Sequence, residues 1–145
     1  MEIVTKKYNE LTLDELYEIL RIRNAVFVVE QTCPYQDIDG NDKNAYHVFA
    51  KDEQGIHACL RVMKIDSATN QVIIGRVLTV KRKSGLGSQI MAEGIRVARD
   101  CLHAEVIKIG AQVQAKGFYE KQGFVQSSVE YMLDDIPHID MTFNK

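Results

Sequence analysis

The feature that most constrains the fold is a buried strand that leads through a glycine turn directly into a helix, between Val72 and Met91. The strand part is apolar and mostly β-branched, a composition typical of a strand that is covered on both faces. Its apolar residues are Val72, Ile73, Ile74, Val77, Leu78 and Val80. Gly85 and Gly87 follow, and a helical pattern opens directly after them. This order predicts a strand–turn–helix unit at the centre of an α/β protein.

The glycine turn has the physical properties of an anion site. Glycines lack the Cβ atoms that would keep a ligand away from the backbone. The first amides of the following helix have no partner within it, and the helix dipole adds partial positive charge there. Such a turn binds phosphate, and Arg82 and Lys83 add further positive charge.

Three nucleotide-binding patterns compete for this turn. A P-loop requires Gly-Lys followed by Ser or Thr, which this turn lacks. A dinucleotide fingerprint requires a third glycine where this chain has Ile90. The remaining pattern, Arg-x-x-Gly-x-Gly from Arg82 to Gly87, resembles the pyrophosphate-binding turn of the GNAT superfamily of acyl-CoA N-acyltransferases. Taken alone, this pattern is a weak signal, and an ordinary strand–helix turn would be the preferred interpretation.

A second segment, from Gln112 to Phe124, strengthens this resemblance. GNAT proteins typically show Asn, then Ala three residues on, then Phe-Tyr-x-x-x-Gly-Phe. The positions that fit are Ala115, Phe118, Tyr119, Gly123 and Phe124, whereas Gln112 replaces the usual Asn. Two motifs in the right order are far more specific than either motif alone.

Further segments resemble the ElaA-like branch of the GNAT proteins, so that the resemblance extends from about Leu16 to Met141. These segments are Phe27-Val28-Val29-Glu30-Gln31, Cys33-Pro34-Tyr35, Asp37-Ile38-Asp39-Gly40 and Ile136-Pro137-His138-Ile139. The resemblance implies the GNAT fold, with a central mixed, mostly antiparallel sheet and helices on both faces. It also implies that the strands at 72–80 and 105–111 splay apart to admit the acyl thioester. Acetyl-CoA is the implied donor, and the amine acceptor is left undefined.

Composition and charge set the outer limits. The chain has 145 residues, of which 46% are apolar and 26% are charged, and we expect one domain over residues 1–145. A net charge of −2 gives no reason to expect a nucleic-acid partner. We find no signal-peptide pattern and no apolar run of membrane-spanning length, so we expect a cytoplasmic protein without membrane contact. Cys33, Cys59 and Cys101 form no metal pattern and no disulfide framework. The sequence leaves open whether the protein forms a homodimer.

Periodicity predicts the other elements in order. Thr12 and Glu15 form a capping box for a helix that should fade near Glu30 and that carries Arg23 on its apolar stripe. Strands are expected at 3–8, 46–50, 56–63, 105–111, 125–132 and 138–143, and helices at 88–102 and 115–122. Gly123 should end the last helix, and a turn is expected at Asp134-Asp135.

The polar loop from Gln31 to Lys43 carries Asp37, Asp39 and Asp42. It lacks the Gly and Glu positions of a calcium loop. We weigh two interpretations: a solvated turn, or an acceptor-side loop whose carboxylates attract a protonated amine. Arg76 could pair with this loop or could hold a carboxylate of the acceptor.

The resemblance assigns acetyl-CoA binding to both motifs. Backbone N–H groups near Leu78 to Val80 would serve the oxyanion and the pantetheine amides, and the turn amides would hold the pyrophosphate. The predicted coenzyme-binding residues are Leu78, Thr79, Val80, Arg82, Lys83, Ser84, Gly85, Leu86, Gly87, Ser88, Gln112 and Tyr119.

Tyr119 is the predicted general acid, because a phenol stays protonated at neutral pH and can donate to the leaving sulfur. The alternative is that it only packs near that sulfur. Many GNAT enzymes place a Glu base on the strand before the turn, but this chain has Gly75 and Arg76 there. His138 is the predicted base, since imidazole titrates near neutral pH. His47, Glu30 and a water chain are alternatives, and no metal is expected.

These observations favour an N-acetyltransferase that moves an acetyl group from acetyl-CoA to a primary amine of a small molecule or a peptide. The alternative is an acyl-CoA-binding sensor without catalysis, which the missing strand carboxylate supports. A nucleotide-binding regulator is disfavoured, because both other phosphate motifs fail.

Overall fold

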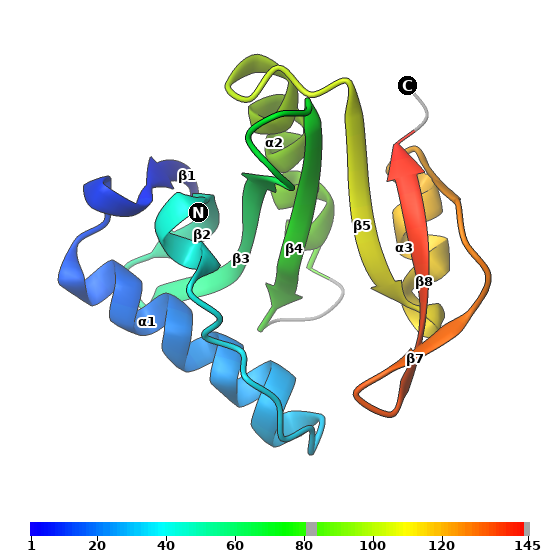
Figure 1. Cartoon of the computed structure of the whole chain (residues 1–145). Coiled ribbons are helices and arrows are strands. Elements are labelled where there is room, and N and C mark those ends of the chain that lie inside the picture. Colours follow the sequence, from blue (N-terminus) through cyan, green and yellow to red (C-terminus); the bar gives the residue numbers. More distant parts are fainter. Residues whose placement is uncertain (81–83, 144–145) are drawn as a thin grey trace.

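The computed structural model describes residues 1–80 and 84–143, so the predictions for Arg82 and Lys83 lie outside the described residues. Within these ranges the chain forms an α/β fold of eight strands and three α-helices (Figure 1). In chain order they are β1 (Glu2–Lys7), α1 (Leu13–Arg23), β2 (Tyr46–Asp52), β3 (Gly55–Lys64), β4 (Gln71–Thr79), α2 (Leu86–Asp100), β5 (Val106–Gln112), α3 (Lys116–Lys121), β6 (Phe124–Gln126), β7 (Tyr131–Leu133) and β8 (Ile136–Phe143). No helix in the described part of the chain is long and apolar enough to span a membrane.

The strands form one mixed sheet in the order β1-β2-β3-β4-β5-β8-β6, and β7 also pairs with β8. Every pair is antiparallel except β4 and β5, which run parallel. The predicted mixed, mostly antiparallel sheet is therefore confirmed.

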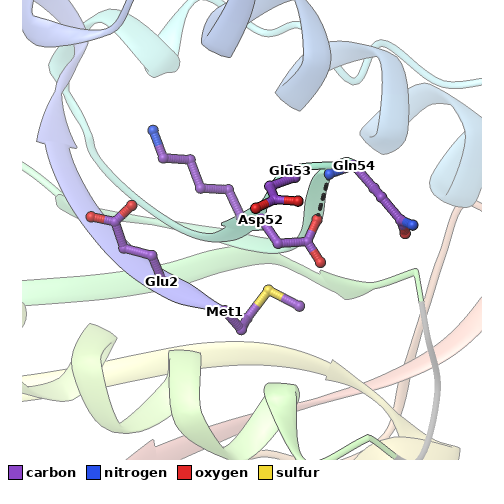
Figure 2. Close-up of a pocket in the computed structure, with 6 residues that line it drawn as sticks. Met1, Glu2, Asp52, Glu53 and Gln54 are labelled. Atoms are coloured by element: carbon purple, nitrogen blue, oxygen red, sulfur yellow. Dashed lines mark hydrogen bonds between the residues drawn. The ribbon is translucent and has the colours of Figure 1, made fainter.

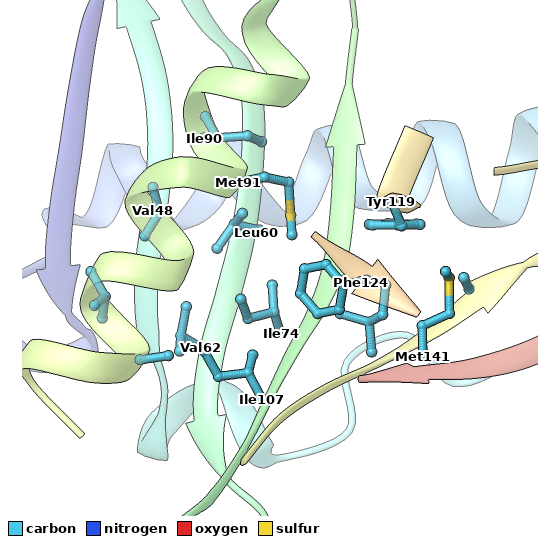
Figure 3. Close-up of a cluster of buried hydrophobic side chains, with 14 of the residues drawn as sticks. Val48, Leu60, Val62, Ile74, Ile90, Met91, Ile107, Tyr119, Phe124 and Met141 are labelled. Carbon is cyan, nitrogen blue, oxygen red and sulfur yellow. The ribbon is translucent and has the colours of Figure 1, made fainter. Parts of the chain in front are cut away.

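Both faces of the sheet carry a hydrophobic core, because successive side chains of a strand point to opposite faces. Val48 and Leu60 belong to the larger core, which packs against α2 and α3 (Figure 3). Phe49 and Cys59, their neighbours in sequence, belong to a smaller core under α1 together with Ile19. The predicted placement of helices on both faces is thus confirmed.

Helix α1 begins as the sequence predicts. Thr12 Oγ1 accepts a hydrogen bond from the Glu15 amide (3.0 Å), and the Glu15 carboxylate accepts one from the Thr12 amide (2.9 Å). These two bonds satisfy amides that no helical carbonyl can reach. A π-helical stretch, Asn24–Glu30, continues the helix up to the predicted end.

A β-bulge in β4 separates this strand from β5. Gly75 faces Arg61 and Leu78 faces Cys59, so two residues of β4 lie opposite one residue of β3. At the bulge Arg76 adopts a left-handed backbone conformation, with φ of 52°. Bulges bend strands, and the parallel ladder accordingly covers only Gln71–Ile73 and Val106–Lys108. Beyond it the two strands diverge, as the family resemblance implies (Figure 1).

The prediction of one long strand at 125–132 is wrong. The structure has two short strands there, β6 and β7, which pair with different parts of β8. Between them the Ser127 amide donates to the Asp140 carbonyl (2.8 Å), and Ser128 Oγ accepts a hydrogen bond from the Asp140 amide (2.9 Å). A serine hydroxyl thus replaces a backbone partner and interrupts the ladder. The turn at Asp134-Asp135 is present, with φ of 50° and 61°.

Candidate active site

A cleft of about 660 Å³ lies where β4 and β5 diverge. Its walls come from β4, β5, β7, β8, α3 and the chain that follows α1. It brings together several residues that the sequence analysis singled out: Arg76, Leu78, Thr79, Gln112, Tyr119 and His138. Of the alternatives for the base, neither Glu30 nor His47 is among the residues that line it.

A second hollow, of about 640 Å³, lies at the turn between β2 and β3 (Figure 2). It is lined by Met1, Glu2 and residues 51–54, and within it the Gln54 amide donates to the Asp52 carboxylate (2.8 Å). It contains none of the predicted site residues. The divergence of β4 and β5 therefore locates the candidate active site.

Tyr119 enters the cleft from the α2 side of the sheet, where its ring belongs to the larger core (Figure 3). Its ring makes edge-to-face contacts with Phe118 (5.1 Å between centroids) and Phe124 (6.1 Å). Burial raises the pKa of Tyr119 to about 12, and the residue is only 8% exposed. The hydroxyl has no hydrogen-bond partner among the described residues, so a protonated phenol is available to a ligand.

His138 lies on the opposite face of the sheet. Its neighbour Ile139 on β8 points into the larger core, so alternation turns the imidazole to the other side. His138 Nδ1 lies 2.7 Å from the Ile136 carbonyl oxygen. A carbonyl only accepts, so Nδ1 carries the hydrogen and Nε2 of the neutral ring is left with a free lone pair. This is the arrangement that a general base requires.

Tyr131 braces the imidazole. Its ring stacks on His138 with centroids 6.0 Å apart, and its hydroxyl donates to the Asp140 carboxylate (2.6 Å). Burial and this hydrogen bond raise the pKa of Tyr131 to about 12. The sequence did not reveal the roles of Tyr131 and Asp140, because their alignment with His138 depends on the register between β7 and β8.

The start of α2 follows directly after Gly85, whose φ of 80° explains why a glycine stands there. Gly87 has a different reason, which the sequence analysis did not foresee. A Cβ atom at Gly87 would lie 3.2 Å from Phe118, so the missing side chain lets that ring pack against the helix. The amides of Leu86 and Ser88 belong to the first helical turn, which has no carbonyl partners within the helix.

The Val80 amide, which was among the predicted donors to the oxyanion and the pantetheine, is not free for a ligand. The Val80 amide donates to the His57 carbonyl (2.7 Å), and Val80 does not line the cleft. The strand amide at this position is therefore occupied, whereas Leu78 and Thr79 remain on the cleft wall.

The carboxylates of the acidic loop are paired with arginines and are not open to an amine. Asp37 and Asp42 are each only 6% exposed, and both form ion pairs with Arg23, at 3.0 and 2.7 Å. Arg61 pairs with Asp42 (3.0 Å) and with Asp39 (2.7 Å). The expectation of a solvated turn is therefore wrong for Asp37 and Asp42 but holds for most other residues of the loop, and arginines already pair with all three carboxylates.

Arg76 completes this arginine–aspartate network, which consists of Arg23, Arg61, Arg76, Asp37, Asp39 and Asp42. Its Nε lies 2.8 Å from Asp37, and its guanidinium lies over the Tyr35 ring (5.4 Å to the centroid). Two roles were considered for Arg76, and in the structure it pairs with the acidic loop. The network ties the loop to the bulge of β4.

The network also changes the pKa values of its carboxyl groups. A hydrogen bond from Arg61 holds the pKa of Asp39 far below its usual range. Burial alone would raise the pKa of Asp42, but hydrogen bonds and charges from Arg23 and Arg61 lower it overall. His47 Nε2 donates to the Asp42 carbonyl (2.8 Å), and burial lowers the pKa of this imidazole. This imidazole is therefore part of the loop's scaffold, away from the cleft.

Two contacts connect the chain after α1 with the far wall of the cleft. Gln112 Nε2 donates to Gln31 Oε1 (3.2 Å), and the Cys33 thiol lies 3.7 Å from the Asp134 carbonyl oxygen. Gln112, which stands where the GNAT motif has Asn, thus closes one side of the cleft.

A sheet that opens between two parallel strands, with a helix start beyond the first of them, defines an acyl-CoA N-acyltransferase fold. The crystal structure of an acyl-CoA N-acyltransferase from Pseudomonas aeruginosa superposes with a TM-score of 0.91 at 36% identity, and covers 99% of this chain and 100% of that one. Residues 7–145 match the family model of the acetyltransferase (GNAT) domain, and the chain belongs to this family.

The resemblance to the ElaA-like branch is also confirmed. The chain is 36% identical to protein ElaA of Escherichia coli (strain K12) over 138 residues, which are 92% of this chain and 90% of ElaA. The crystal structure of Escherichia coli ElaA superposes with a TM-score of 0.92 at 34% identity, over 99% of both chains.

Proposed function

We propose that this protein is a cytoplasmic, single-domain N-acetyltransferase that moves the acetyl group of acetyl-CoA to a primary amine of a small molecule or a peptide. One observation carries the proposal. Tyr119 and His138 line the same cleft from opposite faces of the sheet. A thioester in the gap would have a proton donor on its sulfur side and a proton acceptor on the side from which an amine attacks.

The donor would lie along β4. Backbone groups of Leu78 and Thr79 would pair with the pantetheine amides, and the amides of Leu86, Gly87 and Ser88 would hold the pyrophosphate. Backbone N–H groups on this strand would also stabilise the oxyanion that forms when the amine attacks.

The transfer would begin with removal of a proton from the acceptor. His138 Nε2 takes a proton from the ammonium form of the acceptor, and the free amine attacks the carbonyl carbon. The N–C bond forms, the C–S bond breaks, and Tyr119 gives its phenolic proton to the departing sulfur. The nitrogen becomes positively charged when it attacks, and it loses its second proton, which solvent carries to the Tyr119 phenolate. The products are an N-acetylated amine, the thiol of coenzyme A and the one proton that His138 releases to solvent.

Replacing Tyr119 by Phe tests the acid. Because the hydroxyl has no partner among the described residues, the variant should fold normally and bind acetyl-CoA unchanged. We expect thiol release to show kcat lowered by about 10²-fold, the low end for general acid catalysis, with the same Kd for acetyl-CoA. Tyr46→Phe, a tyrosine on β2 outside the cleft, is the matched control. Equal turnover in Tyr119→Phe rejects the acid role.

Replacing Ser88 by Asp tests the coenzyme site. A carboxylate in the first turn of α2 interacts favourably with the helix dipole, by about 0.3–1 kcal/mol, so the fold should persist. It would repel a pyrophosphate at the same place, and calorimetry should show the Kd for acetyl-CoA raised at least about tenfold, which corresponds to about 1.4 kcal/mol. Ser88→Ala controls for the lost hydrogen bond from Gln122 (3.0 Å). Unchanged affinity in the Asp variant contradicts this assignment.

The second candidate is an acyl-CoA-binding sensor without catalysis. It is supported by Gly75 and Arg76, which occupy the part of β4 where many GNAT enzymes carry a Glu base. Binding of acetyl-CoA without thiol release from the wild type, across polyamines, amino acids, aminoglycosides and peptides, would favour the sensor.

A further inference from the structure

Two glycines face each other across the gap, on the sheet face opposite α2. Gly75 of β4 and Gly110 of β5 both line the cleft, and neither has a left-handed backbone. A Cβ atom on Gly75 would have no described atom within 4 Å, and one on Gly110 would meet only the Tyr131 hydroxyl, at 3.5 Å. A glycine inside a strand weakens that strand. Since neither backbone conformation nor protein packing requires these glycines, we attribute them to close approach of a ligand.

Lys108 lies next to these two glycines, which form the floor of the cleft. It lies two residues before Gly110 on the same face of β5, and opposite Ile73 in the last pair before the strands diverge. It is half-buried in the cleft wall, yet it forms no ion pair and no hydrogen bond with the residues that the structure describes. The apex of the cleft therefore presents an ammonium group without a protein counterion.

The other charges of the cleft differ in how they are compensated. Arg76 is compensated by Asp37 and Asp39. Asp140 accepts a hydrogen bond from the neutral Tyr131 hydroxyl and keeps its negative charge opposite Gly110, and Asp134 lies exposed on the turn between β7 and β8. A ligand that enters the cleft thus meets the Lys108 ammonium at the apex, which favours a negatively charged group there, and the Asp140 carboxylate nearer to His138, which favours the cationic amine.

We propose that Lys108 binds an anionic group of the acceptor, a carboxylate or a phosphate, over the floor formed by Gly75 and Gly110. This inference rests on the proposed function and narrows it: the acceptor is an amine that also carries an anion. The register sets the spacing between the two groups. His138 faces Gln112, which lies four residues beyond Lys108, or about 13 Å along the strand. Because Lys108 spans only part of this distance, the amine and the anion of the acceptor are separated by several bonds.

Matched pairs of amines test the subsite. Thiol release is measured with 4-aminobutyrate against butylamine, 6-aminohexanoate against hexylamine, and phosphoethanolamine against ethanolamine. We expect kcat/KM of the wild type to favour an anionic member at least about tenfold, mainly through KM. The first two pairs report on a carboxylate and the third on a phosphate.

Three variants locate the effect. Lys108→Gln should abolish the preference for the anionic member, whereas Lys108→Arg should retain most of it. Gly75→Ala adds a methyl group where the protein leaves open space, so it should raise KM for the anionic acceptor without lowering the melting temperature or the affinity for acetyl-CoA. The melting temperature of Lys108→Gln is measured as well, to confirm that this variant folds.

The outcomes separate this inference from the proposed function. Turnover without preference for the anionic member, or a preference that survives in Lys108→Gln, overturns the subsite and leaves the acetyltransferase in place. If no amine releases thiol, binding of 4-aminobutyrate and butylamine to the coenzyme A-bound protein is followed by NMR. Preferential binding of 4-aminobutyrate that Lys108→Gln removes then supports the subsite, and equal binding or none overturns it.

Discussion

The two walls of the cleft are built on different principles. The wall formed by β4 and the loop after α1 contains the arginine–aspartate network, with Arg23 only 1% exposed. The wall formed by β5, β7 and β8 has half-exposed polar side chains, held by single hydrogen bonds and ring contacts, such as Tyr131 and His138. In the first wall charges compensate each other and fix the backbone, while in the second they stay available to a ligand. Charge near an active site is therefore not by itself evidence of substrate binding.

The largest effect is expected from removing a charge of the first wall. Arg23→Ala leaves Asp37 and Asp42 buried without their shared partner, and we expect the free energy of unfolding to fall by about 3–5 kcal/mol. Urea denaturation measures this loss. Arg21→Ala on the same helix removes an exposed pair with Glu18 and should change nothing measurable. A similar stability for both variants would show that the network does not stabilise the fold.

A smaller effect on the first wall should appear with pH. The pKa values of Asp39 and Asp42 are lowered in the folded protein, so both carboxylates contribute stability above the ordinary Asp pKa of about 3.9. This contribution is lost as the pH falls toward the lowered values. We expect the free energy of unfolding, measured in urea between pH 7 and pH 3, to decrease toward low pH.

Asp39→Asn is the matched variant for this pH dependence. It should be less stable than the wild type at pH 7 and should lose less stability between pH 7 and pH 3, because one of the two carboxylates is gone. An equally steep dependence in the variant would assign the acid sensitivity to other groups.

The smallest effect on stability is expected for a substitution of His138 in the second wall. This substitution should instead change catalytic activity. The glutamine of His138→Gln can keep a hydrogen bond to the Ile136 carbonyl, so the free energy of unfolding should change by less than about 1 kcal/mol. If His138 is the base, kcat/KM of the wild type should rise with pH, and this rise should disappear in the variant because glutamine is not a base. A pH profile identical to that of the wild type would exclude His138 and leave ordered water as the proton acceptor.

Features that depend on neighbouring residues could be predicted from the sequence. The capping box of Thr12 and Glu15, the turn at Asp134-Asp135 and the left-handed Gly123 are local, and all of them are present. The overall sheet and its splayed strands followed from the family resemblance, which periodicity alone could not supply.

Features that depend on distant partners could not be predicted. The burial of Asp37 depends on Arg76, which is far away along the chain, and the packing role of Gly87 depends on Phe118. One signal was visible in the sequence. Arg23 lies on the apolar stripe of its helix, and a charge in that position requires a buried partner. The acidic loop that follows the helix was the nearest source of one.

The short parallel ladder has a consequence for amide hydrogen exchange. Beyond Ile73 and Lys108, the backbone groups of β4 and β5 that face the gap between these two strands have no partner on the other strand. These unpaired groups nevertheless lie in the middle of the sheet. Such amides exchange with water without any opening of the fold, whereas their neighbours in the paired ladders wait for local unfolding. Deuterium uptake should therefore trace a narrow, fast-exchanging line through the centre of the molecule, and acetyl-CoA should slow exchange along that line first.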